Sequence, residues 1–557
     1  LLDGIPVNSA FDGQFDPTII PTENIDRIKM TTGPSSVLYG QGGLGAVINI
    51  ITKKGSEGVR VTANAETGTC EPYLARASVS GAGGEFDYFL STSASKVRGF
   101  PLSHSFKPTS EQDSGMRDNS DRQRNNLFGN VGYSPDTDVS LGLTFSLAKG
   151  EYGKPSGTLN EPFDPFASPP KYERIDDFNN RSIQLAGDYQ ASKNFSVRGW
   201  VFLNQTNQED TMYDNKNFDS FNLIAGSFQE KIRTRVSGAT LQPKYDMEDF
   251  GVITCSFSAE RDKWENTGEL TMAADTYSEV DESKALRICS GSMEYEVSPM
   301  KNLGVVAGYG RFRQTRESRN EHAFNALYGV FYDILVDTRL KASFKKNVRF
   351  PTLSDLYDPS KGNPDLETER AYTYEAGIEQ KLPLKGMLSL NGFFTRARNL
   401  IQNDQASGQN MNLAEMNFAG FEVTAAAVPV DKLQIQASYT FLHSHDKSRE
   451  GREQQQYTPR DKVVMEAKYD FDFGLTPFVS VQYVGNQYFY TKNSITPVQR
   501  MKLNDYTLVS MKLSQRFLSG RASIYAGAKN IFDENYETSY GFPQAGRFCY
   551  GGAEWSF

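Results

Sequence analysis

The chain has 557 residues, with 59 basic and 68 acidic side chains and a formal net charge of −9. This mildly acidic balance argues against a nucleic-acid partner, because proteins that bind nucleic acids usually carry a basic surface. No apolar run reaches the roughly 18 residues of a transmembrane helix. A membrane-spanning β-barrel remains allowed, because only every second residue of its strands faces lipid.

The first 55 residues differ in pattern from the rest of the chain. They contain the β-rich stretch 25–30, a turn at Gly33 and Pro34 and a glycine cluster at 40–45, with few polar alternations. The sequence also begins inside a strand-turn pattern, at Leu1 and without an initiator Met. We expect a compact α+β piece here, from which an upstream part is missing.

The glycine cluster formally matches G-x-G-x-x-G at Gly40, Gly42 and Gly45. A dinucleotide fingerprint needs a strand before the glycines and a helix after them, because the helix N-terminus holds the pyrophosphate. Here a short turn or single helical turn, 34–39, comes first and a β-branched run, 46–52, follows. We interpret the glycines as structural, permitting positive φ and close backbone packing.

From about residue 59 onward, polar and apolar residues alternate with a period of two. The clearest segments are 195–204, 432–441 and 463–471; in the second, one face is Leu433, Ile435, Ala437, Tyr439 and Phe441. Such segments are roughly 10–13 residues long, near the ~9–11 that a tilted transmembrane strand requires. They predict strands with one face in hydrocarbon and the other towards a filled, watery interior.

Connections alternate between tight turns and long polar segments. The tight turns lie at 135–138, 191–194, 247–249, 298–302, 382–386, 429–431 and 518–520. The long segments are 98–124, 150–179, 207–234, 262–283, 347–368, 399–417, 444–459 and 487–502. One trimmed rim and one elaborated rim are typical of a transmembrane barrel, and the count is about 22 antiparallel strands.

The last strand places Phe557, Trp555 and Ala553 on one face and Ser556 and Glu554 on the other. A final strand of this kind suits closure of the barrel. Closure removes the free sheet edges that would otherwise template aggregation.

Several motifs of this sequence resemble those of TonB-dependent outer-membrane receptors. The plug-like motifs are 2–8, 20–21, 25–29, 33–40 and 45–52. The barrel-like motifs are 348–353, 362–367, 527–533, Tyr536, Gly546, Arg547 and Phe557. The resemblance spans nearly the whole chain.

The resemblance implies an all-β membrane protein: a 22-stranded transmembrane barrel, residues 56–557, with the C-terminal part of a plug, residues 1–55, in its lumen. It places the chain in the bacterial outer membrane, in contact with its lipid, with the long loops extracellular and the C-terminus on the periplasmic side. The resemblance implies that the TonB box and the first half of the plug precede Leu1. Because Leu1 falls in the middle of a motif, we expect a truncated sequence rather than a copy that cannot be energised.

The function implied is import of a scarce, large nutrient, driven by TonB and its inner-membrane energising complex. The ligand is a small molecule, expected to be a metal chelate. A ferric siderophore leads because it is the commonest cargo of the family, while cobalamin, haem and oligosaccharide stay open. A passive porin and a surface-binding barrel are the competing classes. We expect no enzyme activity, no cofactor, no catalytic residue and no resident metal.

Candidate ligand contacts lie in the plug and the long loops. Segment 8–16 offers Phe11, Asp12, Gln14 and Phe15, because family loops of this region reach the extracellular apex; a solvated turn is the alternative. The loop candidates are Tyr488, Tyr490, Phe163, Phe166 and Tyr172. For Tyr488 and Tyr490 we favour an interfacial aromatic girdle over ligand contact.

Histidines and cysteines add three smaller expectations. His443 and His445 form an i, i+2 pair, which without a further ligand is more consistent with a solvated loop than with a metal site. Cys255 and Cys289 should lie opposite each other across a hairpin, outward-facing, within disulfide reach. Cys70 and Cys549 should lie near the ends of the first and last barrel strands, on opposite faces.

Overall fold

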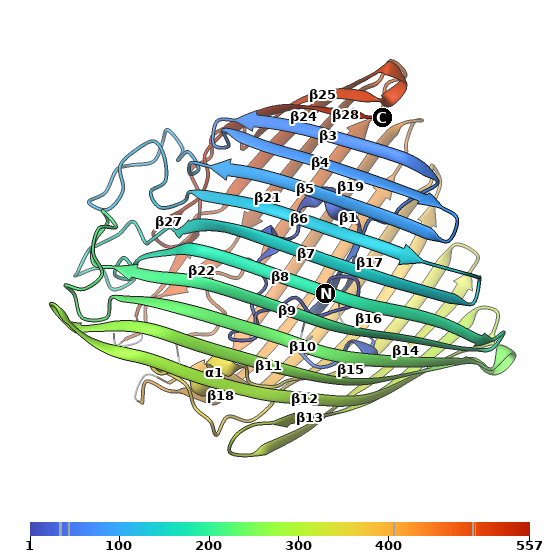
Figure 1. Cartoon of the computed structure of the whole chain (residues 1–557), viewed down its shortest axis with the longest axis horizontal. Helices are drawn as coiled ribbons and strands as arrows, with labels where there is room; N and C mark the ends of the chain where they lie inside the picture. The colour runs from blue at the N-terminus through green and yellow to red at the C-terminus, as the bar shows by residue number, and fades with distance from the viewer. Residues whose placement is uncertain (33–35, 43–44, 405–406, 450, 493–494, 496) are drawn as a thin grey trace.

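The computed structural model describes residues 1–32, 36–42, 45–404, 407–449, 451–492, 495 and 497–557, so the predicted turn at Gly33 and Pro34 lies outside these residues. The chain forms a closed, antiparallel barrel of 22 strands around an inner segment (Figure 1). Strand β28 pairs with β25 and with β3, so the last strand meets the first. The predicted closed barrel of 22 strands is confirmed.

The barrel strands follow one another around the wall in chain order. They are β3 (Gly58–Gly68), β4 (Tyr73–Gly83), β5 (Phe86–Val97), β6 (Arg122–Tyr133), β7 (Val139–Lys154), β8 (Tyr172–Ser192), β9 (Phe195–Tyr213), β10 (Phe228–Asp246), β11 (Val252–Ala273), β12 (Thr276–Met300), β13 (Leu303–Thr315), β14 (Asn320–Leu335), β15 (Thr338–Arg349), β16 (Glu369–Leu382), β17 (Gly386–Asn403), β18 (Asn410–Ala427), β19 (Leu433–Asp446), β20 (Asp461–Tyr469), β21 (Leu475–Gly485), β24 (Tyr506–Phe517), β25 (Ala522–Lys529) and β28 (Phe548–Ser556).

The two rims differ as predicted. Tight connections, two of them with the 3₁₀ turns η4 (Glu248–Phe250) and η5 (Leu518–Gly520), form what we call the short-turn rim. The long-loop rim, at the left of Figure 1, carries helix α1 (Leu353–Tyr357) and two small sheets. These sheets are β22 (Gln487–Tyr490) with β23 (Arg500–Leu503), and β26 (Glu537–Ser539) with β27 (Phe542–Pro543).

Several strands are longer than predicted and extend the wall beyond the expected loops. Strands β8, β11 and β12 have 21, 22 and 25 residues. Residues 262–283, predicted as a polar loop, are instead the regular top of the β11–β12 hairpin. The outward side chains here, such as Lys263 and Glu265, are polar like Asn266 on the inner face, so the polar–apolar alternation that marks the lower strands is lost although Trp264 is buried.

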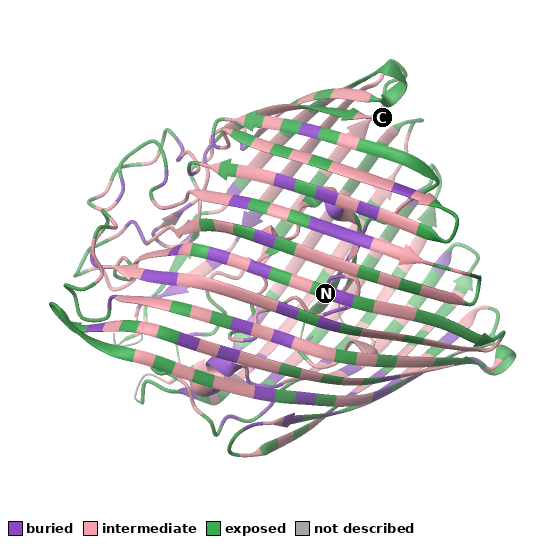
Figure 2. Ribbon diagram, in the orientation of Figure 1, coloured by how far each residue is buried: buried purple, intermediate pink, exposed green. Residues whose placement is uncertain are grey.

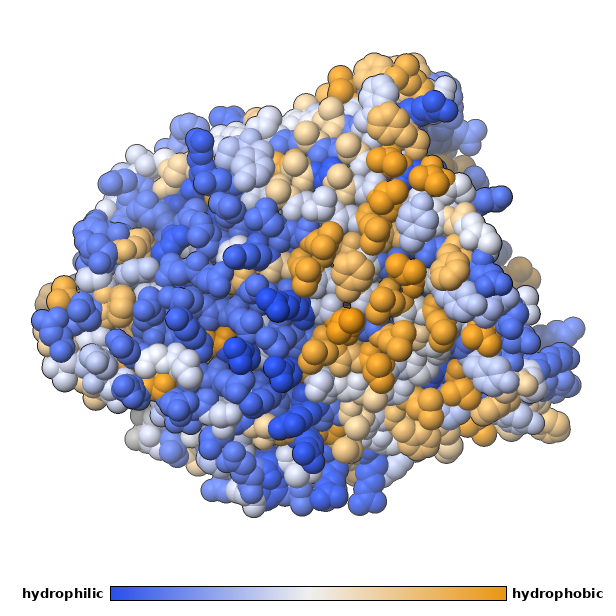
Figure 3. Space-filling view, viewed as in Figure 1, coloured by the Kyte–Doolittle hydropathy of each residue, from blue (hydrophilic) through white to orange (hydrophobic). Residues whose placement is uncertain are grey.

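On the face that Figure 3 shows, apolar side chains gather on the part of the wall nearer the short-turn rim. Leu185 faces Val201 across the β8–β9 pair, and Leu241 faces Phe257 across β10–β11, each about half exposed. The outer surface towards the long-loop rim is hydrophilic. Within the described residues, no helix has both the length and the apolar character to cross a membrane.

The segment ahead of β3 lies inside the barrel (Figure 1), and buried residues recur along the wall strands between more exposed ones (Figure 2). Its elements are η1 (Pro17–Ile19), η2 (Thr22–Asn24), η3 (Val37–Tyr39) and the antiparallel pair β1 (Ile25–Thr32) and β2 (Ala46–Thr52). Gly40 and Gly42 adopt φ of 85° and 98°, which explains their glycines. The backbone does approach the wall here, since the Gly42 amide donates to the Val348 carbonyl (2.9 Å). An added Cβ at either glycine would meet no described atom within 4 Å, so the positive φ and not a lack of space requires glycine.

The predicted disulfide between Cys255 and Cys289 is wrong, since all four cysteines are free. The hairpin turn lies nearer the chain's C-terminus than we assumed, so Cys255 pairs with Met293, and Cys289 with Ala259. This offset along the strands is too long for a disulfide, whose Cα atoms lie within about 7 Å. Cys70 and Cys549 do lie at the β3–β28 seam, where the Thr69 amide donates to the Cys549 carbonyl.

Candidate functional site

The inner segment presents one self-bonded loop, residues 8–16, which we call the apex loop. The Ser9 amide donates to the Gln14 carbonyl (2.7 Å), and the Gly13 amide donates to the Ser9 carbonyl (3.0 Å). The Gln14 amide donates to Asp12 Oδ1 (3.1 Å). These bonds fix the loop and leave the side chains of Asp12 and Gln14 exposed.

The apex loop lies towards the long-loop rim. Its Phe11 carbonyl accepts a 2.7 Å hydrogen bond from the amide of Ser354 in helix α1, which belongs to the long connection between β15 and β16. The other end of the inner segment contacts the base of the wall, where the Gly55 amide donates to Asp87 Oδ1 (3.3 Å). Asp12 and Gln14 therefore lie at the end of the inner segment that is nearer the long-loop rim.

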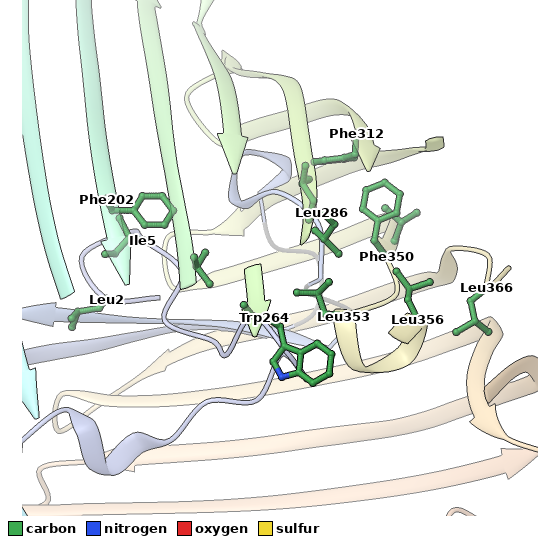
Figure 4. Packing of buried hydrophobic residues seen from close by; sticks show 14 of the residues in the cluster. Leu2, Ile5, Phe202, Trp264, Leu286, Phe312, Phe350, Leu353, Leu356 and Leu366 are labelled. Carbon is green, nitrogen blue, oxygen red and sulfur yellow. The ribbon is translucent and has the colours of Figure 1, made fainter. Parts of the chain in front are cut away.

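The aromatic side chains of the apex loop pack against the wall. Phe11 stacks on Trp264 with ring centroids 4.6 Å apart and an interplanar angle of 25°. Trp264 is 1% exposed and belongs to a core of buried residues that includes Leu353 and Leu356 of α1 (Figure 4). A capping box between Thr352 and Asp355 begins α1 and so holds these leucines in place.

Phe15 packs against the same core. Of the four plug residues predicted to contact a ligand, Phe11 and Phe15 thus serve partly as anchors, and Asp12 and Gln14 carry the free polar groups. Trp264 was missed by the sequence reading, because residue 264 fell in a segment interpreted as a loop.

The inner wall beside the apex loop is acidic. Lys154 donates to Asp210 Oδ2 (2.9 Å) and also bonds Glu173, and Asn266 donates to Glu230 Oε2 (2.8 Å). We call Glu173, Asp210 and Glu230 the acidic belt. Lys154 pairs with two of these carboxylates, Glu173 and Asp210, while Glu230 bonds the neutral Asn266. The belt therefore favours neutral or cationic groups over anions.

An ion pair joins the apex loop to this wall. Arg124 Nη2 lies 3.4 Å from Asp16 Oδ2, with side-chain exposures of 2% and 34%. The guanidinium also lies over the Phe178 ring, 4.1 Å from its centroid. Arg124 is thus engaged both with Asp16 of the inner segment and with Phe178 of the wall.

Aromatic residues of the long loops pack mainly on one another. Phe489, 2% exposed, stacks on Tyr540 (4.7 Å) and on Tyr457 (6.0 Å), and Phe166 meets it edge-on (5.3 Å). Tyr540 donates to Asp164 Oδ2 (2.9 Å), and burial together with this bond raises the pKa of Tyr540 to about 12. This cluster ties four long loops together.

The remaining predicted loop aromatics have different surroundings. Tyr490 is 6% exposed and accepts a hydrogen bond from the Gln454 amide (3.0 Å), so the girdle interpretation fails for it. Tyr488 lies under the Arg500 guanidinium, and Tyr172 donates to Glu111 Oε2 (2.7 Å). Phe163, 98% exposed, is free to contact a ligand or partner.

The described part of the chain adds no further ligand to the histidine pair considered from the sequence. His443 and His445 are both exposed on β19. Among the residues that the structure describes, His, Cys, Asp and Glu side chains nowhere gather in a group of three that could hold a metal ion. The candidate site is therefore the apex loop with the acidic belt.

Comparison with known proteins agrees with this architecture. The sequence model of the TonB-dependent receptor-like β-barrel matches residues 75–531, and that of the TonB-dependent receptor plug domain matches residues 1–47. The vitamin B12 transporter BtuB of Vibrio cholerae serotype O1 is 25% identical over 568 aligned residues, which cover 99% of this chain and 82% of that protein. BtuB of Photobacterium profundum is 26% identical, covering 100% and 84%.

Solved structures show the same fold at low identity. The copper transporter OprC superposes with a TM-score of 0.82 at 15% identity, covering all of this chain and 90% of that one. The siderophore receptor PirA from Acinetobacter baumannii gives a TM-score of 0.80 at 16% identity, with the same coverage.

Proposed function

Because the chain belongs to the family of TonB-dependent receptors of the bacterial outer membrane, we propose that it imports a scarce, bulky metal chelate, with a ferric siderophore as the first candidate. In this proposal the long loops face the outside and the C-terminus faces the periplasm. TonB and its inner-membrane energising complex supply the work, and residues 1–55 act as one plug.

The observation that carries the proposal is the anchored inner segment. Phe11 on Trp264, Asp16 on Arg124 and Asn24 on Ser91 fix it to the wall at separate points. A solute as large as a chelate passes only if some of these contacts break, which requires work. This requirement favours an energised importer over a passive porin.

The charge of the site narrows the ligand class. Residues 8–16 include two carboxylates and no basic side chain, and the acidic belt lies beside them. An anionic chelate such as a ferric tris-catecholate would meet like charge there, whereas a neutral or cationic chelate would not. We therefore propose a neutral or cationic ferric siderophore, for example of the hydroxamate class.

Cobalamin is the second candidate. Two curated relatives with full-length matches are vitamin B12 transporters, and a ligand rich in amide groups suits the exposed amide of Gln14. At 25–26% identity this similarity makes cobalamin a candidate to test and not an assignment.

Binding and uptake of three probes test the proposal: a neutral ferric trihydroxamate, a ferric tris-catecholate and cyanocobalamin. We expect the purified protein to bind the trihydroxamate, and cells that express it to accumulate the iron only when TonB is present. Asp12→Lys should strengthen binding of the anionic tris-catecholate, whereas the same charge change at the exposed Asp249 of η4, on the short-turn rim, should leave binding unchanged. Preferred binding of the tris-catecholate would overturn the charge argument, and a persistently open pore in planar bilayers would favour the passive class.

A further inference from the structure

The top of the β11–β12 hairpin projects beyond its neighbour β13. Strand β12 pairs with β11 from Thr276 onwards, but with β13 only from Arg287 to Met300. Along residues 276–286 the second edge of β12 therefore faces no strand among the described residues. We call this stretch the free edge; in Figure 1 it continues to the left past β13.

The ladder shows which backbone groups point outward from the free edge. The Thr271 amide donates to the Ser227 carbonyl, so odd-numbered residues of β11 bond to the β10 side. Even-numbered residues of β11 therefore bond to their even-numbered partners in β12, such as Ser278 opposite Leu270. The N–H and C=O groups of Tyr277, Glu279, Asp281 and Ser283 then point to the unoccupied side.

The free edge carries more acidic than basic side chains. Tyr277, Glu279, Asp281 and Ser283 are exposed, and the neighbouring Glu282 adds a third carboxylate. Lys284 is engaged with Glu317 at 3.1 Å and does not offset these charges. A strand that pairs here would place its side chains opposite carboxylates, where Lys or Arg is favourable and Asp or Glu is not.

We propose that the free edge is a docking site for an extended, basic segment of a partner protein, which adds to the barrel sheet as an extra strand. An unpaired edge is a template for strand addition: main-chain hydrogen bonds give affinity, and the alternating side chains give selectivity. A second copy of this chain fits less well, because edge-to-edge pairing would bring the same carboxylates together.

Binding of two synthetic peptides with uncharged, blocked termini tests this proposal. The full chain is used in detergent, without siderophore or cobalamin. One peptide alternates Lys with Thr and the other alternates Glu with Thr. We expect saturable binding of the Lys–Thr peptide, at least about tenfold tighter than the Glu–Thr peptide. Because the assay contains no chelate, its failure leaves the transport proposal untouched.

Two variants separate strand addition from loose charge attraction. Ser283→Pro removes one outward N–H while proline remains tolerable on an edge strand, so binding should be lost; Ser283→Ala keeps the N–H and should bind normally. The double variant Glu279→Lys/Asp281→Lys should reverse the preference between the peptides. Equal binding of both peptides, or full binding by Ser283→Pro with the β11–β12 ladder intact, would overturn the proposal.

Discussion

The wall holds the plug in two chemically different ways on different sides of the barrel. The apolar zone, where Leu2, Ile5 and Phe11 meet Phe202 and Trp264, belongs to one buried core. The polar zone is a set of hydrogen bonds on β5 and β6. Ser91 donates to Asn24, Asn130 donates to Thr52 Oγ1 (3.3 Å), and the Gly55 amide donates to Asp87 (3.3 Å).

The difference between the apolar and polar zones indicates which contacts between plug and wall break more easily. Separating two apolar surfaces costs about 25 cal/mol of free energy for each Å² that becomes exposed to water. A hydrogen bond within the protein can instead be exchanged for one to water at a net cost of only about 0.5–1.5 kcal/mol. The polar zone can therefore yield in small steps when the plug is pulled. The apolar zone fixes the apex loop and its ligand groups until a larger force acts.

Trp264→Ala should have the largest effect on this comparison. It removes the surface on which Phe11 stacks and leaves a cavity, at a cost of about 3–5 kcal/mol. We expect the Gly13 amide to exchange its hydrogen on the order of a hundred- to a thousandfold faster, measured by hydrogen–deuterium exchange in detergent.

Phe163→Ala is the matched control, because its ring is 98% exposed and its loss should leave exchange unchanged. The Lys53 amide, which donates to the Asn24 carbonyl (2.9 Å) in the polar zone, should keep its protection in Trp264→Ala. Equal acceleration at Gly13 and Lys53 would mean that the plug opens as one unit, and the distinction between the zones would fail.

Asn24→Ala should have a smaller effect, confined to the polar zone. Asn24 is 1% exposed and accepts from Ser91, which is 5% exposed, so the substitution leaves a buried hydroxyl unsatisfied, at a cost of about 1–3 kcal/mol. Hydrogen–deuterium exchange at the Lys53 amide measures this loss of stability. In a cycle with Ser91→Ala, the double variant should lose less than the sum of the single variants; strict additivity would show that the bond contributes nothing.

The sequence predicted the barrel better than the site. Alternation in segments such as 432–441 and the closing residues Trp555 and Phe557 marked strands correctly, because hydrocarbon outside and water inside impose a period of two. Residues 262–283 were not recognised as strands because outward side chains there, such as Lys263 and Glu265, are polar. The Cys255–Cys289 prediction failed with the position of that turn. The contact between Trp264 and Phe11 could not be predicted from the sequence, because it depends on how the plug lies in the lumen.

Asp16→Asn tests the contact that joins the apex loop to the wall outside the apolar core, and it should have the smallest effect. Asp16 caps η1 through Oδ1, which accepts from the Thr18 amide (2.8 Å), and faces Arg124 through Oδ2. Asparagine keeps the capping oxygen and removes the charge, so the loss reports the ion pair, about 0.2–1 kcal/mol for a contact that solvent partly screens.

Salt separates this ion pair from packing. Added salt should weaken protection of the Thr18 amide in the wild type and change it little in Asp16→Asn, because only the wild type has a charge pair to screen. Arg124 keeps its position over Phe178 in both proteins, which limits the loss. A loss as large as that of Trp264→Ala would show that charge, and not the apolar zone, holds the apex loop against the wall.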